Sequence, residues 1–353
     1  MPAQEVPQLL DALLRASGPS GYEGPAAKVW RDAAGFAELT RDTMGSTVAL
    51  IGGESEGPLF AVVGHIDEIG LVVTHIDEKG FAWFEPIGGW DPQILIGQRV
   101  VVQGLNGPVP GVCGRKPIHL LKPDQRKKVV ELSGLHIDVG AADGERAKEL
   151  FRVGDPVVVL AEPVAVDGDR LVSKSMVNRL GAYVALEATR RVKERGSVVG
   201  AMAGVAAAQE EIGLFGAGTS AFSLAPDLAI AVDVTHASDA PGIEEKETGV
   251  HPLGSGPVIQ RGATLSPIVS DLLIEVAERE GIEYTLEASG RGSHTDADAI
   301  AIARGGIPAG VVSIPLRYMH SPVEMVDLGD VEAVIELICA FAAALTPDIE
   351  LTR

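Results

Sequence analysis

The sequence predicts an α/β protein whose mostly parallel sheet is flanked by helices and interrupted by an inserted β-rich, barrel-like domain. In the first part of the chain, and again after Ser173, apolar strand-like runs alternate with helical segments, a pattern typical of a parallel sheet covered on both faces. Between about Ile69 and Pro163, short β-rich runs alternate with Gly, Pro and Asn-Gly turn signals, which indicate a small barrel or sandwich. We therefore expect an α/β domain of residues 1–68 and 171–353, and an inserted domain of residues 69–170.

The chain opens with helical patterns followed by strand patterns. Leucines at helical spacing predict a helix around Leu9–Leu14, which ends at the breaker cluster Ser17–Gly21. A second helix is expected over Gly24–Ala34, followed by strands at Thr47–Ile51 and Leu59–Gly64. The insertion should contain strands at Gly70–Ile76, Phe81–Phe84, Arg99–Gln103 and Val157–Leu160, and a helix at Gly144–Phe151.

After Ser173 the alternation of helix and strand returns. The expected helices are Asn178–Glu194, Ser266–Glu280, Asp296–Arg304 and Gly329–Leu345. The expected strands are Val199–Ala208, Asp227–Val234, Tyr284–Glu287 and Gly310–Ile314.

Composition and charge limit the classes of function. The 353 residues carry a formal charge of −20, which repels nucleic acid and anionic membranes and attracts cations, so we expect neither nucleic acid nor membrane as a partner. Aromatic residues make up only 4% of the chain, which argues against base stacking or carbohydrate platforms. Two cysteines and a start without basic or apolar runs favour a cytoplasmic location.

Acidic and histidine side chains follow four of the expected strands. His65 and Asp67 follow the strand that ends at Gly64, and Glu210 and Glu211 follow the next strand of the sheet. The others are Asp233, near the end of a third strand, and His320, which follows a fourth. Ligands bind beyond the carboxyl ends of strands in such sheets, and buried charges need partners. Converging His, Asp and Glu residues favour a divalent metal and hence a metal-dependent hydrolase.

Each of these residues also has an ordinary structural interpretation. A lone buried histidine such as His65 is more often a satisfied core residue than a ligand, and Glu210 and Glu211 alone could form a solvated pair. Asp67, two residues after His65, can orient its imidazole. We expect Asp296 and Asp298 to serve a helix N-terminus, His294 to be a second-choice ligand, and His236 to lie beside Asp233.

Five segments together resemble the M42 family of metallo-aminopeptidases, of the glutamyl and tetrahedral type. They are Ser17–Glu23, Gly64–Gly70, Gln209–Leu214, Asp233–His236 and His320–Met325. The resemblance covers essentially the whole chain. It implies release of N-terminal residues from short peptides, zinc or cobalt as cofactor with two metals per chain, and a homo-oligomer between a dimer and a hollow dodecamer.

The resemblance also implies roles for the residues. His65 and Asp233 would belong to one metal half-site, and Glu211 and His320 to the other. Glu210 would be the general base that takes a proton from water, and Asp67 would orient His65. Residues 1–68 and 171–353 would form the catalytic domain, and residues 69–170 a dimerisation domain.

Val177 departs from the family pattern. The family has a metal-bridging aspartate at the position where Ser175–Gly181 carries Val177. A bridging carboxylate holds two cations about 3.5–4 Å apart and offsets their repulsion. Without it we expect weaker binding, or one metal in place of two.

Three hypotheses follow from these residues. The first is a metal-dependent aminopeptidase in which Val177 impairs metal binding. The second is a catalytically inactive relative that acts as a peptide-binding or structural assembly. The third is a glycosidase that uses Glu210 and another carboxylate, which the low aromatic content and the histidines disfavour.

Overall fold

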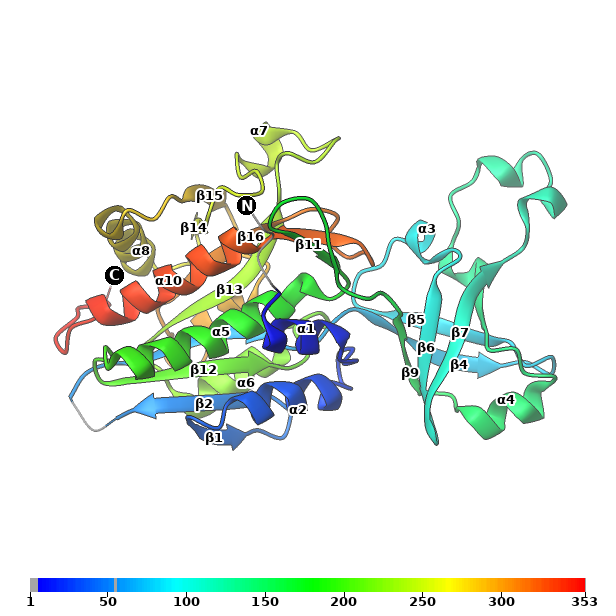
Figure 1. Ribbon diagram of the computed structural model, residues 1–353, viewed down its shortest axis with the longest axis horizontal. Helices are drawn as coiled ribbons and strands as arrows, with labels where there is room; N and C mark the ends of the chain where they lie inside the picture. The colour runs from blue at the N-terminus through cyan, green and yellow to red at the C-terminus, as the bar shows by residue number, and fades with distance from the viewer. Residues whose placement is uncertain (1–5, 54–55, 353) are drawn as a thin grey trace.

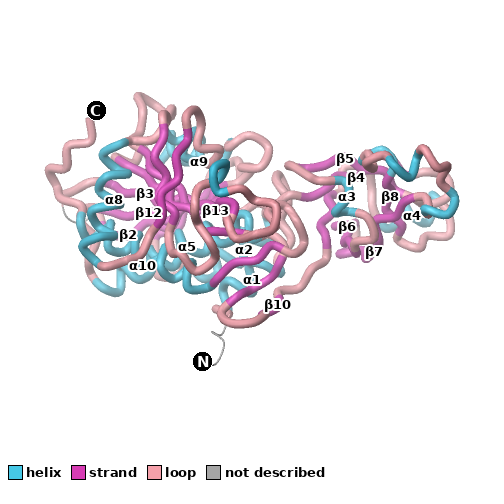
Figure 2. Tube along the Cα trace, turned by 90° about the horizontal axis from the view of Figure 1, so that it is seen from above, coloured by secondary structure: helices cyan, strands magenta, loops and turns pink. Residues whose placement is uncertain are grey.

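The computed structural model of the protein describes residues 6–53 and 56–352. It consists of a large mixed sheet flanked by helices and a separate closed barrel (Figure 1). Figure 2 shows the barrel displaced to one side of the sheet and joined to it by a narrow connection. The predicted fold class is confirmed.

The large sheet has eight strands in the order β1-β2-β12-β3-β13-β16-β14-β15. Its strands are β1 (Glu38–Arg41), β2 (Thr47–Gly52), β3 (Leu59–His65), β12 (Ala201–Ala207), β13 (Leu228–His236), β14 (Val258–Gly262), β15 (Thr285–Ser289) and β16 (Ala309–Leu316). The four central strands, β12, β3, β13 and β16, are parallel to one another. Their carboxyl ends therefore meet at one edge of the sheet.

Helices cover both faces of this sheet. One face packs against α1 (Gln8–Arg15), α2 (Gly24–Ala33), α5 (Met176–Arg195), α8 (Pro267–Glu280) and α10 (Leu328–Ala344). The opposite face packs against α6 (Phe215–Leu224) and α9 (Asp296–Ala301). Because both faces are buried, the central strands are almost continuous apolar runs.

A glycine pair lets α5 lie against the strand that ends at His65. A Cβ atom on Gly64 would lie 2.1 Å from the backbone carbonyl carbon of Gly181, which is far closer than two carbon atoms can pack. Only glycine at position 64 therefore permits this approach of helix and strand, which fixes the backbone beside His65.

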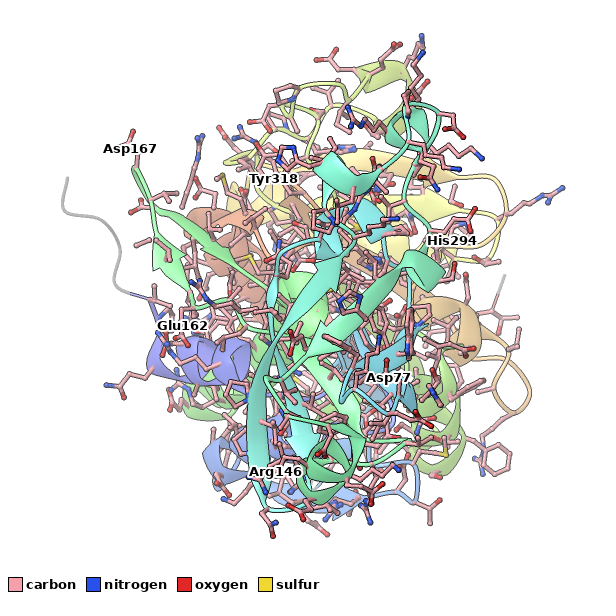
Figure 3. The ribbon with its side chains drawn as sticks, turned by 90° about the vertical axis from the view of Figure 1, so that its right-hand side faces the viewer. Asp77, Arg146, Glu162, Asp167, His294 and Tyr318 are labelled. Atoms are coloured by element: carbon pink, nitrogen blue, oxygen red, sulfur yellow. The ribbon has the colours of Figure 1, made fainter. Side chains whose placement is uncertain are left out.

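The barrel closes in the order β4-β5-β8-β7-β6-β9. Its strands are β4 (Gly70–Ile76), β5 (Ala82–Ile87), β6 (Arg99–Gly104), β7 (Gly107–Arg115), β8 (Leu135–Asp138) and β9 (Pro156–Val159), and its helices are α3 (Pro92–Leu95) and α4 (Gly144–Leu150). A separate apolar core fills it. Figure 3 looks at the molecule from this end, with Asp77 and Arg146 on the barrel. A role of this barrel in dimerisation stays a prediction.

A small antiparallel sheet carries the chain back from the barrel to the large sheet. It consists of β10 (Val164–Ala165), β11 (Arg170–Ser173) and β17 (Glu324–Asp327). Ser173 pairs with Glu324, so the segment that leads to Val177 lies beside the segment that follows His320.

Several elements differ from the sequence prediction. Helix α9 ends at Ala301 rather than Arg304, and the sequence patterns predicted neither α6 nor β14. Helix α6 contains Gly216 and Gly218, which have low helix propensity. Gly216 is required by packing, because its Cβ would lie 2.2 Å from the Ala208 carbonyl oxygen. Among the described residues, no helix has the length and apolar character needed to cross a bilayer.

Candidate active site

The predicted site residues meet at the carboxyl edge of the four parallel strands. His65 is the last residue of β3, Glu210 and Glu211 follow β12, Asp233 lies in β13, and His320 follows β16. These five residues line one cavity of about 400 Å³, and Val177 lines it with them. The structure thus brings together residues that are as much as 255 positions apart, from His65 to His320.

His65, Glu210 and Asp233 form the tightest cluster of possible ligands. One donor atom from each lies within 4.8 Å of the other two. His65 is 1% exposed, with Nδ1 at 3.3 Å from Asp67 Oδ1 and Nε2 at 3.6 Å from Glu210 Oε2. Burial by itself would lower the pKa of His65, but the carboxylates of Glu210, Asp67 and Asp233 outweigh this effect and raise it.

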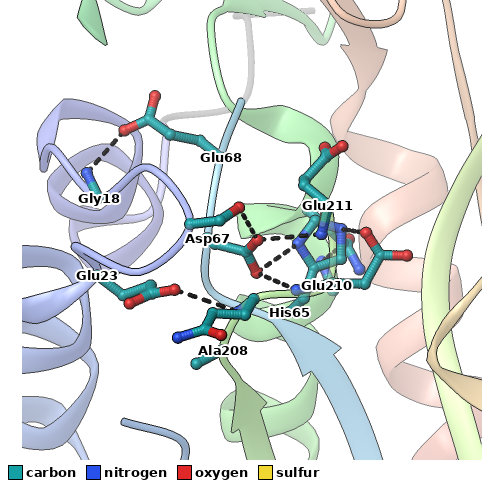
Figure 4. A network of polar contacts seen from close by, with 12 residues as sticks. Gly18, Glu23, His65, Asp67, Glu68, Ala208, Glu210 and Glu211 are labelled. Atoms are coloured by element: carbon teal, nitrogen blue, oxygen red, sulfur yellow. Dashed lines mark hydrogen bonds and ion pairs between the residues drawn. The ribbon is translucent and has the colours of Figure 1, made fainter. Parts of the chain in front are cut away.

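Asp67 organises the surrounding backbone as well as His65. Its Oδ1 accepts a hydrogen bond from the Glu210 N–H at 3.0 Å, and its Oδ2 accepts from the Glu211 N–H at 3.2 Å and from Ser20 Oγ at 2.5 Å. Figure 4 shows this carboxylate between His65 and the turn that carries the two glutamates. One buried aspartate therefore fixes three of the candidate residues at once.

A second cluster lies where the barrel joins the sheet. His320 Nε2 is 3.3 Å from Glu211 Oε1, and His320 Nδ1 is 2.9 Å from the Gly89 carbonyl oxygen. A proton on Nδ1 donates to that carbonyl and leaves the Nε2 lone pair free to bind a ligand. Glu324 Oε1 accepts from the His320 N–H at 2.8 Å, and its Oε2 accepts from the Met176 N–H at 2.7 Å. Glu324 thus links the His320 loop to the segment that contains Val177.

The centre holds more buried acid than nearby Lys or Arg residues neutralise. Burial, assisted by repulsion between the acids, outweighs the attraction of His65 and raises the pKa of Glu210 and of Asp296. Burial is also the main cause that raises the pKa of Asp233, and it raises that of Glu324 to about 8. Such groups are stabilised when a cation shares the site.

Some ligand atoms of the centre form no hydrogen bond. Among the described residues, Nε2 of His65 and Oε1 of Glu211 are buried and form no hydrogen bond. Nitrogen and carboxylate donors of this kind suit zinc, cobalt or manganese. These atoms without a hydrogen bond and the excess of buried acid together fit a divalent metal.

Sequence reasoning missed some members of the site. Asp296 is 2% exposed, and neither of its oxygens has a hydrogen-bond partner among the described residues. It lies at the first position of α9, where Thr295 is the cap and accepts from the Ala297 N–H. Asp296 therefore does not cap this helix, although it lies in the first turn, where its charge faces the helix N-terminus as expected. Its negative charge contributes to the raised pKa of Glu210.

Two further glutamates support the loops around the centre. Glu23 Oε1 accepts from the N–H groups of Gly21 and Gln209. Burial would raise the pKa of Glu68, but Lys174 and Arg179 outweigh this effect and lower it. Both lie within the motifs that carry the family resemblance, and Glu68 directly follows Asp67. Their charges alone gave no sign that they would be buried.

The chain matches known proteins over most of its length. The sequence profile of the M42 glutamyl aminopeptidase family matches residues 45–337. A lysyl aminopeptidase from Pyrococcus furiosus is 34% identical over 96% of this chain and 97% of its own. The crystal structure of a TET aminopeptidase from Thaumarchaeota archaeon SCGC AB-539-E09 has a TM-score of 0.91 at 35% identity, covering 96% of both chains.

A third relative is described by its assemblies. The TET1 peptidase of Pyrococcus horikoshii, which can assemble into a tetrahedron or a large octahedral shell, is 32% identical with a TM-score of 0.84. The match covers 96% of this chain and 99% of the relative.

Proposed function

The chain belongs to the M42 glutamyl aminopeptidase family, and from this premise we propose that it is a metal-dependent aminopeptidase that releases N-terminal residues from short peptides. The observation that carries the proposal is the cavity that joins His65, Glu210, Glu211, Asp233 and His320 at one sheet edge. We propose His65 and Asp233 as ligands of one metal, and Glu211 and His320 as ligands of the other.

Glu210 and Asp67 have different roles in the proposed reaction. When bound, zinc or cobalt would polarise the scissile carbonyl and make a nearby water more acidic. Glu210 takes the proton from that water and delivers it to the leaving amine. Its raised pKa falls towards the useful range once a cation lies beside it. Asp67 holds the His65 ring and the Glu210 backbone in position through its contacts with both.

The acidic residues that line the cavity attract the free amino end of the substrate. Four acidic residues line the cavity, namely Glu210, Glu211, Asp233 and Glu287. A protonated amine is favoured in such a field, and an N-terminal residue therefore enters with its amine towards the centre.

The barrel and the relatives support an oligomer. We propose that the barrel of residues 69–170 forms contacts between copies of the chain, because a relative that matches almost the whole chain can assemble into a tetrahedron or a large octahedral shell. A location in the cytoplasm also stays a proposal, supported by two buried free cysteines among the described residues.

Removal of the metal is expected to abolish activity. Incubation of a panel of short peptides with the protein and zinc or cobalt should release free N-terminal residues, detected by mass spectrometry. A chelator should reduce this release at least about 100-fold, and added metal should restore it. Release that a chelator does not affect would contradict the proposal, and chelator-insensitive release of reducing sugar would favour a glycosidase.

Metal binding is expected to tighten as pH rises. Burial raises the pKa of both Glu210 and Asp233, and the surrounding acids raise that of His65, so protons compete with the metal at low pH. The difference in Tm between zinc-loaded and chelator-treated protein should therefore grow from about pH 6 to about pH 8. Differential scanning calorimetry measures this difference. The same increment at every pH would contradict the expected competition.

A further inference from the structure

A row of polar residues crosses the sheet from the candidate centre to the edge strand β15. Asp233 of β13 pairs with Ser313 of β16, Ser313 pairs with Val258 of β14, and Gln260 pairs with Glu287 of β15. Paired residues on neighbouring strands share a face, and so do residues two apart on one strand. Asp233, Ser313, Gln260 and Glu287 therefore face the same side, and all four line the cavity.

The far end of this row offers acceptors that lack partners. Gln260 is 5% exposed, and its Oε1 forms no hydrogen bond among the described residues. Glu287 is half-buried because β15 alternates between inward and solvent-facing residues, with Leu286 exposed on the other side. Within the described chain, Glu287 has no hydrogen bond or ion pair. Acceptors in a partly buried wall gain most from a donor that a ligand brings.

The residues that line the cavity favour cationic over anionic ligand groups. It is lined by four carboxylates, and no described Lys or Arg residue lines it. Arg261 is next to Gln260 in sequence but faces the other side and pairs with Asp271 at 2.8 Å. A substrate carboxylate in this cavity would meet like charges, whereas an ammonium or guanidinium group would meet opposite ones.

The dimensions fit a long side chain. Three strand spacings separate β13 from β15, or roughly 14 Å between their backbones. A lysine side chain spans roughly 6 Å over its five bonds, which is slightly more than one strand spacing, so a lysine whose Cα lies over Gln260 of β14 can place its ammonium group beside Glu287 of β15.

We infer that Glu287, assisted by Gln260, is a specificity-determining residue that selects peptides with N-terminal Lys or Arg. This inference rests on the proposed aminopeptidase function. Glu287 accepts the hydrogen bonds of the substrate's cationic group, and Gln260 Oε1 accepts a further one.

The test compares substrates in the metal-loaded protein. We expect kcat/KM for lysyl- and arginyl-p-nitroanilide to exceed that for the leucyl and glutamyl compounds by at least about tenfold. Glu287→Gln should lower the lysyl value about 10- to 100-fold, at least about tenfold more than it lowers the leucyl value. Glu287→Lys should favour the glutamyl compound. Glu283→Gln is the matched control, because Glu283 is exposed just before β15 and does not line the cavity.

Calorimetric titration with lysinamide and leucinamide gives a readout without turnover. Tighter binding of lysinamide that Glu287→Gln abolishes supports the inference even if no substrate is hydrolysed, in which case only the proposed function fails. Hydrolysis without a preference for basic residues would overturn the inference and leave the proposed function standing. Equal binding of the two amides would overturn it as well.

Discussion

Glu210→Gln is expected to lower kcat by about 10³-fold or more, because glutamine cannot take a proton from water. The amide has nearly the same shape as the carboxyl group, and the Glu210 N–H still donates to Asp67 Oδ1. The fold and the proposed ligands His65 and Asp233 should therefore be unaffected. Single-turnover release of an N-terminal residue, measured with bound zinc quantified by mass spectrometry, checks this result.

Glu247→Gln is a matched control for this variant. Glu247 is exposed in α7 (Glu245–Thr248) and does not line the cavity. Its replacement should leave both kcat and metal content unchanged. A Glu210→Gln protein that keeps its full turnover would remove Glu210 from the role of general base.

Val177→Asp is expected to tighten metal binding, so that the metal content rises to two per chain, and to raise kcat about 100-fold or more. Val177 is 7% exposed and lines the same cavity as both candidate half-sites. An added carboxylate there would supply a ligand to each half-site and offset the repulsion between two cations. Metal content from inductively coupled plasma mass spectrometry and turnover of the best peptide measure the two effects.

Val177→Asn separates charge from size in this experiment. Asparagine has a similar volume to aspartate but carries no negative charge, so it should gain neither a second metal nor activity. If Val177→Asp also gains neither, position 177 is not the missing bridge.

Local sequence patterns were sufficient to predict an element or a site residue where its burial depends only on the face of its own helix or strand, or on its place at a strand end. The alternation of apolar strands with helices predicted a parallel sheet, and it placed His65 and Glu211 close to the ends of strands, as the structure has them. The patterns failed for α6, because glycine has low helix propensity and only close packing on Ala208 explains its presence. They also failed for β14, whose register depends on its neighbours β16 and β15.

The sequence by itself determined the fold class, the family and the residues that gather at the carboxyl edge of the sheet. These follow from hydrophobic periodicity and from motifs, which are local properties of the chain. Only the tertiary structure decided that Asp67 binds the Glu210–Glu211 turn, that Asp296 is buried, and that Glu287 shares the cavity. Each depends on pairing between distant segments, because strand order and burial are set by long-range contacts that local patterns do not specify.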